Sequence, residues 1–212
     1  MKKKVGIKPA FKIETKLSKE GYNFICGLDE VGMSCLAGPV YAAAVIFDSH
    51  PKIKGINDSK LLSPEQREKL APIIKERAVS WGIGKASVDL INKVNIFHAS
   101  KIAMLDAISN LNIIPDYLLV DGKFKLNFIK LPQQALVKGD RRSISIAAAS
   151  IIAKVARDNF MCELAEKFPE YGWQQNKGYP TKFHRTSIKE CGITLHHRLN
   201  FAGVIKQGKW RT

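Results

Sequence analysis

Four acidic side chains could carry chemistry in this sequence, because each lies where an apolar run gives way to glycine: Asp29, Glu30, Asp121 and Asp140. Open α/β sheets form their ligand sites at such strand ends. Several carboxylates that converge in a partly buried cleft cannot all stay charged without a cation. Hard oxygen donors without His or Cys select Mg²⁺ or Mn²⁺ over zinc, so these residues predict a divalent-metal site.

A metal site of this kind in a basic protein suits phosphodiester hydrolysis. Two ions about 3.5–4 Å apart would activate a water molecule and stabilise the leaving oxygen. Asp or Glu beside Gly is also common turn chemistry, and at any single position a turn is the simpler explanation. Asp29 and Glu30 would face opposite sides of a strand, so they share one site only if the strand ends or bulges near Gly32.

The charge balance points to a polyanionic partner. The 212 residues include 34 Lys and Arg against 19 Asp and Glu, which gives a formal net charge of +15. Nucleic acid is the commonest such partner, and an anionic membrane surface or merely solvated lysines are the alternatives. The sequence shows neither a transmembrane run nor a signal-peptide core. We therefore expect a cytoplasmic protein with no membrane partner and, since nothing demands a dimer, a monomer.

Strands that lead and then alternate with helices must position the acidic residues. Apolar runs predict strands at 24–29, 40–47, 79–88, 117–120 and 135–137. Helical spacing and start signals predict helices at 64–77, 97–111, 144–168 and 182–190. This order predicts an α/β fold with a mixed central β-sheet flanked by helices and a small C-terminal helical part. We expect a basic N-terminal arm or edge element at 1–20, a core at 21–170, and a C-terminal helical region with a basic tail at 171–212.

Six motifs follow one another along residues 22–201. They are Gly27-Leu28-Asp29-Glu30-Val31-Gly32 with Leu36-Ala37-Gly38-Pro39-Val40, Asn57-Asp58-Ser59-Lys60, Val120-Asp121-Gly122, Val137-Lys138-Gly139-Asp140 with Ile146-Ala147-Ala148-Ala149-Ser150, Lys177-Gly178-Tyr179, and His197-Arg198 with Phe201. Each is moderately specific by itself. In this order the set resembles the bacterial ribonuclease HII family and leaves little room for another.

The resemblance implies a ribonuclease H-like fold for the catalytic core, with the C-terminal region completing the substrate cleft. It implies a two-metal-ion endonuclease that hydrolyses the RNA strand of RNA–DNA hybrids and leaves 5′-phosphate and 3′-hydroxyl ends. Ribonucleotides embedded in duplex DNA are a second expected substrate. The family's catalytic, metal-binding carboxylates fall on the same four acidic residues. Asp29 and Asp121 are expected to bind metal directly, Glu30 to hold the site on the 2′-hydroxyl side, and Asp140 to bind or orient the second ion.

The resemblance also implies substrate contacts outside the metal site. Tyr179 matches the family tyrosine that packs on the sugar at the RNA–DNA junction, where an aromatic face excludes a 2′-hydroxyl; a core tyrosine is the alternative. Further candidates for phosphate contacts, or for packing and salt-bridge roles, are Lys60, Lys138, Lys154, Arg157, His184 and His197.

One motif departs from the family pattern. The family has Gly-Arg-Gly after the Asp-Glu step, and in the family this loop grips the backbone at the junction; here the positions are Gly32, Met33 and Ser34. Met33 offers no charge to a phosphate, so one contact of roughly 1.5–3 kcal/mol is missing. We expect metal-dependent cleavage to survive and the grip on single-ribonucleotide junctions to weaken.

Three functions are compatible with these patterns. The leading interpretation is a metal-dependent ribonuclease that uses Mg²⁺ or Mn²⁺, with two ions present when substrate is bound. A non-catalytic RNA–DNA hybrid-binding protein of the same fold is the alternative that the altered loop motivates. Another nuclease of this fold, acting on DNA ends or junctions, is a third.

Overall fold

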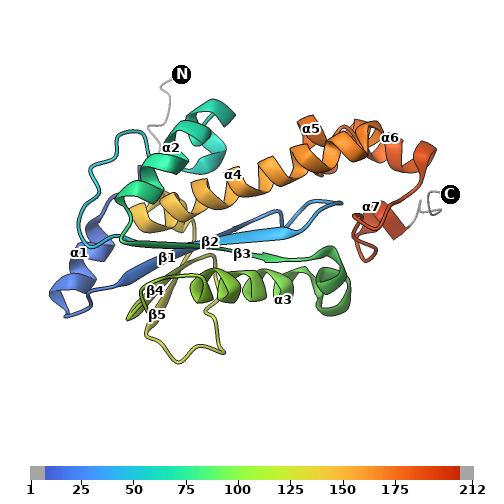
Figure 1. The fold of residues 1–212 in the computed structure, drawn as a ribbon. Helices are drawn as coiled ribbons and strands as arrows, with labels where there is room; N and C mark the ends of the chain where they lie inside the picture. Colours follow the sequence, from blue (N-terminus) through green and yellow to red (C-terminus); the bar gives the residue numbers. More distant parts are fainter. Residues whose placement is uncertain (1–7, 206–212) are drawn as a thin grey trace, which may run out of the picture.

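Five strands form one mixed sheet in the computed structural model, which describes residues 8–205 (Figure 1). The strands are β1 (Ile25–Val31), β2 (Val40–Ile46), β3 (Ser80–Ala86), β4 (Tyr117–Asp121) and β5 (Gln133–Leu136). Their order across the sheet is β3-β2-β1-β4-β5. β1 pairs antiparallel with β2 and parallel with β4, so the central strand joins an antiparallel half to a parallel half. The predicted α/β fold with a mixed sheet is confirmed.

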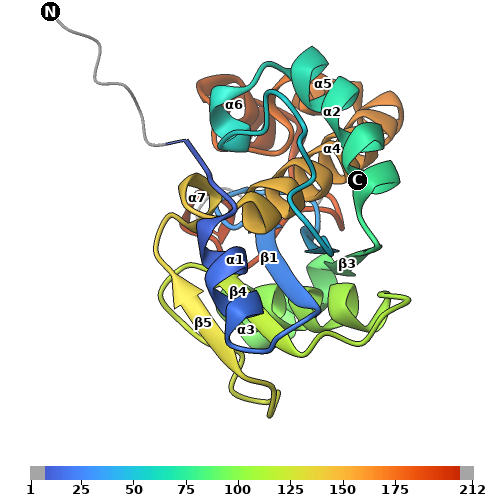
Figure 2. The same ribbon diagram turned by 90° about the vertical axis from the view of Figure 1, so that its left-hand side faces the viewer.

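Helices cover both faces of this sheet. They are α1 (Lys12–Lys19), α2 (Pro64–Arg77), α3 (Val88–Ser109), α4 (Ile144–Lys167), α5 (Trp173–Asn176), α6 (Lys182–Cys191) and α7 (Ala202–Ile205). α3 lies on one face, and α4 with α2 above it lies on the other, as Figures 1 and 2 show. α4 continues past the sheet and carries the C-terminal helices at its far end (Figure 1). Among the described residues, no helix combines the length and apolar character needed to cross a bilayer.

Small residues allow both helix layers to approach the sheet closely. A Cβ atom on Gly27 of β1 would lie 2.2 Å from the backbone of Ser145 in α4, and one on Gly84 of β3 would lie 2.2 Å from the Ala103 carbonyl of α3. The first turns of α4 are buried on all sides, including the alanines at 147–149. Close backbone contact of this kind fixes the position of β1, and with it the acidic residues at its end.

The observed elements differ from the predicted ones in three places. The region expected to be a basic arm contains α1, whose Glu14 and Leu17 are buried. α3 begins at Val88 rather than near residue 97, because Ser87 caps it and Asn95, with φ 67°, kinks it inside the helix. α5 and α7 were not predicted as separate helices. The domain boundaries at 20/21 and 170/171 stay predictions, and the basic tail beyond residue 205 lies outside the described residues.

Candidate active site

Parallel pairing brings the predicted acidic residues to one edge of the sheet. The register of β1 and β4 places Leu28 beside Val120, so Asp29 and Asp121 follow at neighbouring positions, where β4 ends and β1 continues to Val31. Asp121 in turn lies beside Leu136 at the end of β5. Asp140 follows in a short 3-10 turn, Gly139–Arg141, that leads from β5 towards α4.

The side chains of Asp29 and Glu30 lie on opposite faces of the sheet, next to the end of β4. β1 keeps a regular ladder with β2 through Val31, so the strand neither ends nor bulges at these residues, contrary to the condition set by the sequence. Asp29 is 6 % exposed and receives a hydrogen bond from Ser150 of α4, whereas Glu30 lines a cavity on the α3 face. The negative charge of Asp121 nevertheless raises the pKa of both Asp29 and Glu30.

The carboxylates perturb one another strongly. Burial, followed by the negative charges of Glu30 and Asp121, raises the pKa of Asp29 well above its usual range. Burial and the charge of Asp121 raise the pKa of Glu30 to about 7. Burial, with Asp58 and Asp121, raises the pKa of Asp140 to about 6. All three shifts show that negative charge is in excess at this edge, which is the condition that a divalent cation relieves.

The carboxylate oxygens at this edge suit a hard cation, although the carboxylates are not already grouped around one point. Within residues 8–205, no three His, Cys, Asp or Glu side chains already form a group that could hold a metal ion. Two acidic oxygens are instead occupied by backbone donors: Asp29 Oδ1 accepts from the Glu30 amide at 2.8 Å, and Asp121 Oδ1 accepts from the Gly139 amide at 2.6 Å. The remaining carboxylate oxygens are of the type that Mg²⁺ and Mn²⁺ prefer.

Asp58 is a fifth carboxylate at this edge that the sequence argument did not select. It is 1 % exposed, and its Oδ2 accepts from Arg141 Nε at 2.9 Å and Nη2 at 2.7 Å. Burial alone would raise its pKa, but the Lys60 amide and the Arg141 guanidinium outweigh burial and lower the pKa of Asp58. The fold brings Asp58 next to Asp140 of the fourth motif. In the sequence, the Asn57-Asp58-Ser59-Lys60 motif was the signal that could have identified Asp58 as a site residue.

Two buried arginines bind backbone carbonyls around the loop at Gly32, Met33 and Ser34: Arg198 binds the loop itself, and Arg157 binds segments beside it. Arg198 Nη1 donates to the carbonyls of Gly32 at 2.7 Å and Met33 at 3.3 Å. Arg157 donates to the carbonyls of Pro39, Lys177 and Ala37 at 3.0, 2.9 and 3.2 Å. Both arginines are fully buried, so Arg157 shapes the cleft and is not placed to contact a phosphate.

These arginines join the loop to Tyr179. The Leu36 amide donates to the Gly178 carbonyl at 2.8 Å, and the Arg157 guanidinium lies 5.8 Å from the centre of the Tyr179 ring. Tyr179 is half-buried, and burial raises its pKa to about 12. It lines a cavity of about 410 Å³ that none of the four predicted acidic residues lines.

The predicted cations fall into different environments. Lys60 and Lys138 are exposed, and the Lys60 charge reaches Glu30 and Asp140, whose pKa values it lowers. Lys154 forms an ion pair with Asp158 at 2.7 Å. His184 and His197 are buried, which gives them packing and positioning roles.

Solved structures of ribonucleases H share this architecture. The chain is similar to the ribonuclease H2 of Pyrococcus horikoshii OT3, with a TM-score of 0.73 and 24 % identity, over 86 % of this chain and 96 % of that one. It is also similar to the ribonuclease HII of Archaeoglobus fulgidus, solved in complex with PCNA, with a TM-score of 0.73 and 29 % identity over 84 % and 95 % of the two chains. The fold therefore places the chain among the ribonuclease H nucleases.

Sequence relatives narrow this class to one family. The ribonuclease HII family model matches residues 26–204. Ribonuclease HII of Ruegeria sp. (strain TM1040) is 48 % identical over 93 % of this chain and 86 % of that protein, and ribonuclease HII of Bacillus thuringiensis (strain Al Hakam) is 49 % identical over 91 % and 74 %. The chain belongs to the ribonuclease HII family of endoribonucleases, which confirms the resemblance drawn from its motifs.

Proposed function

We propose that this chain hydrolyses the RNA strand of RNA–DNA hybrids, and ribonucleotides embedded in duplex DNA, by a two-metal-ion mechanism that leaves 5′-phosphate and 3′-hydroxyl ends. The family supports the endonuclease activity. The single observation that supports the metal mechanism is the convergence of acidic residues at one edge of the sheet, where strand pairing places Asp29 of β1 next to Asp121 of β4 and the turn after β5 carries Asp140. All of these carboxylates come from one chain, which supports a monomer as the active unit.

Asp29, Glu30, Asp121 and Asp140 would hold the ions, as catalytic residues of the reaction. Bound Mg²⁺ or Mn²⁺ would supply a nucleophilic water and stabilise charge on the leaving oxygen. Asp29 and Asp121 would provide direct ligands from adjacent strands, Glu30 would contribute from the α3 face, and Asp140 would contribute from the turn after β5. Asp29 and Asp140 are buried and Glu30 and Asp121 are half-buried, and partial exclusion of water strengthens their electrostatic effect.

The surrounding residues bind and orient the nucleic acid. Lys60 and Lys138 are exposed near the acidic edge and would contact backbone phosphates. Tyr179, whose ring centre lies 5.8 Å from the Arg157 guanidinium, would pack on the deoxyribose of the junction. An A-form-like hybrid is recognised through groove shape and 2′-hydroxyls, so we expect no strong sequence preference.

Loss of the carboxylates tests the metal assignment. Asp29→Asn and Asp121→Asn should each lower cleavage of a long hybrid at least about 100-fold, because the metal contribution is worth several kcal/mol. Affinity for the hybrid, measured by anisotropy, should stay close to that of the unaltered chain. EDTA should stop the unaltered enzyme. Undiminished cleavage in either variant would disprove the assignment, and binding without any cleavage by the unaltered chain would favour a non-catalytic hybrid-binding protein.

The junction loop makes a second, separate prediction. Gly32 is buried, Ser34 is exposed, and half-buried Met33 packs against the core beneath α3, so the loop presents no side-chain cation at Met33. Incision of duplex DNA with one embedded ribonucleotide should therefore be slower than cleavage of an all-RNA strand paired to DNA. Initial rates on substrates with one, four or all ribonucleotides measure this. A strong preference for the single ribonucleotide would refute the weakened grip.

A further inference from the structure

A cavity of about 200 Å³ adjoins the acidic edge on the α3 face of the sheet. Glu30 and Asp121 line it together with the apolar side chains of Met33, Phe97 and Phe124. The cavity is therefore continuous with the candidate active site, and it is distinct from the cavity that Tyr179 lines.

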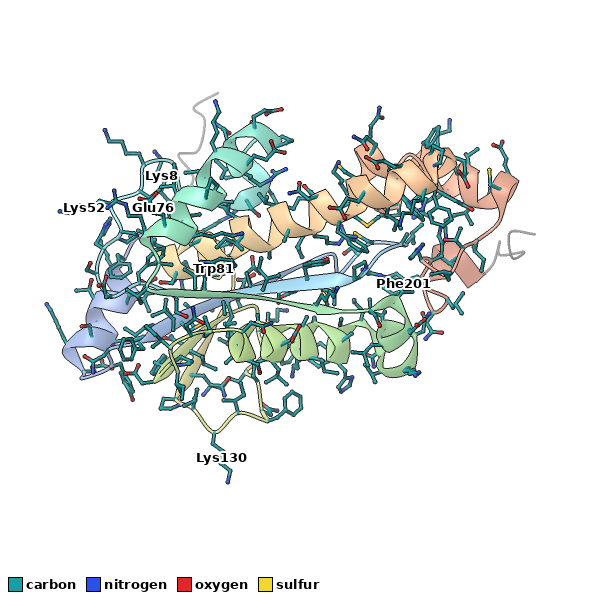
Figure 3. The ribbon with its side chains drawn as sticks, in the orientation of Figure 1. Lys8, Lys52, Glu76, Trp81, Lys130 and Phe201 are labelled. Carbon is teal, nitrogen blue, oxygen red and sulfur yellow. The ribbon has the colours of Figure 1, made fainter. Side chains whose placement is uncertain are left out.

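Phenylalanine rings in and beside this cavity are open to solvent. Phe97 is 37 % exposed, Phe124 59 % and Phe128 60 %. The rings of Phe97 and Phe124 meet edge to face with their centres 5.3 Å apart. The last two phenylalanines belong to the segment between β4 and β5, which extends away from the sheet to Lys130 (Figure 3). A contiguous exposed apolar group on a monomer marks a binding surface.

Lysine side chains lie close to these phenylalanine rings and in the cavity. Lys101 Nζ lies 4.5 Å from the centre of the Phe97 ring, 5.9 Å from that of Phe124 and 5.8 Å from that of Phe128. Lys123 lines the same cavity. Within residues 8–205 neither lysine takes part in an ion pair, so both charges are available to an anion. We name Phe97, Phe124, Phe128 and Lys101 the aromatic–lysine patch.

We propose that the aromatic–lysine patch is a nucleotide subsite of the substrate cleft. A base or sugar next to the scissile phosphate packs on Phe97 and Phe124, and Lys101 and Lys123 bind flanking phosphates. The occupant is a nucleic-acid strand because the patch combines aromatic faces with cations and opens directly onto the acidic edge. Met33 adds apolar surface to the same cavity, which suits the face of a base or sugar. The proposal takes its substrate class from the proposed function.

Binding without cleavage tests the subsite directly. Affinity for a fluorescent RNA–DNA hybrid is measured by anisotropy in EDTA. Phe124→Ala should raise the dissociation constant about 5- to 150-fold, since one stacked base is worth about 1–3 kcal/mol. Lys101→Gln should raise it as well and should lower the slope of log Kd against log salt by about one unit or slightly less. Ile114→Ala is the matched control, because Ile114 is 84 % exposed at the opposite end of β4 and should bind as the unaltered chain does.

The outcomes separate this subsite from the proposed activity. Unchanged affinity in Phe124→Ala, in Phe128→Ala and in Lys101→Gln overturns the subsite, even if the enzyme cleaves hybrids and even if the patch captures a protein. Thermal unfolding verifies that the variants fold. A chain that binds hybrids through the patch and cleaves none keeps the subsite and refutes the proposed catalysis. A chain that binds no hybrid refutes both.

Discussion

Two buried histidines show how single residues are positioned behind Tyr179. The Thr194 amide donates to His197 Nδ1 at 3.0 Å, so His197 carries its proton on Nε2 and donates to His184 Nε2 at 3.3 Å. Trp173 Nε1 donates to the same His184 nitrogen at 3.0 Å, which leaves His184 Nδ1 to donate to the Tyr179 carbonyl at 3.0 Å. Every ring nitrogen therefore has a partner while both histidines are neutral.

This neutral arrangement makes stability depend on pH. Burial, and then the charge of His184, lowers the pKa of His197 from 6.5 to about 3. The unfolded chain takes up a proton near pH 6.5 and the folded chain does not, so the free energy of unfolding decreases as pH falls from 6.5 towards 3. The contribution is complete above pH 6.5, and its loss amounts to about 1.4 kcal/mol per pH unit.

His197→Gln should remove this dependence. The stability difference between the unaltered chain and the variant should shrink by about 2 kcal/mol between about pH 7.5 and about pH 5, as measured by urea unfolding. The acidic residues with raised pKa values change the free energy of unfolding with pH in the opposite direction. Both proteins contain these residues, so their contribution cancels in the difference. His98→Gln, at an exposed histidine, should show a constant difference. A constant difference for His197→Gln too would contradict the argument.

For single residues, the sequence pattern identified the acidic site residues more readily than the buried arginines. Asp29 and Asp121 stand at visible breaks between apolar runs and glycine, and the structure brings them together. Arg157 has no carboxylate partner that spacing could suggest, because its acceptors are carbonyl groups of distant segments. The motif resemblance selected Arg157 as a candidate for a phosphate contact or a packing role, and its complete burial favours the packing role.

At the scale of elements, α1 fixes the start of α4. Glu14 is 1 % exposed, and its Oε1 accepts from Ser143 Oγ at 2.6 Å and from the Ser145 amide at 3.0 Å. A carboxylate at a helix N-terminus is stabilised by the free amide groups there. The Ser143 amide also donates to the Gly139 carbonyl, so the contact extends to the turn that bears Asp140. α1 lies outside residues 26–204, which the family model matches, yet it supports the acidic edge.

Glu14→Ala should therefore destabilise the fold. We expect the free energy of unfolding to fall by about 2–3 kcal/mol, because two hydrogen bonds to a buried carboxylate are lost and their donors stay buried. Glu20→Ala is the control, since Glu20 forms only an exposed ion pair with Lys16 and should change stability by less than about 1 kcal/mol. Urea unfolding at neutral pH measures both. Equal effects of the two variants would show that Glu14 is no anchor.

The sequence predicted a helix well where a capping signal marks its first residue. Ser63 and Gln66 form a capping box, the kind of start signal on which that helix was predicted, and α2 runs over the predicted residues 64–77. α3 was predicted too short, because the kink at Asn95 breaks the spacing of apolar residues on its two sides. The cap at Ser87 was the signal that could have extended it. A backbone kink of this kind interrupts the periodic spacing of apolar residues, so that spacing does not reveal one continuous helix.

At the scale of the whole molecule, a strongly basic chain surrounds an acidic edge. The net charge of +15 attracts a polyanion from any direction, and the carboxylates at β1 and β4 repel it until cations neutralise them. The sequence predicted the total charge but not its distribution. Lys75 lies 4.3 Å from the centre of the Trp81 ring on β3, an edge strand of the sheet, whereas the Lys60 charge reaches Glu30 and Asp140.

Salt dependence distinguishes a local contact from this general attraction. Each phosphate neutralised by a cation contributes about 0.7–0.9 to the slope of log Kd against log salt. Lys60→Gln should lower the slope for a hybrid by that amount in EDTA, because Lys60 is proposed to contact a phosphate next to the acidic edge. Lys75→Gln removes the same charge at the β3 edge and should leave the slope unchanged. Equal decreases in both variants would mean that the hybrid senses only the total charge, and the cleft would then owe its specificity to groove shape and 2′-hydroxyl contacts rather than to Lys60.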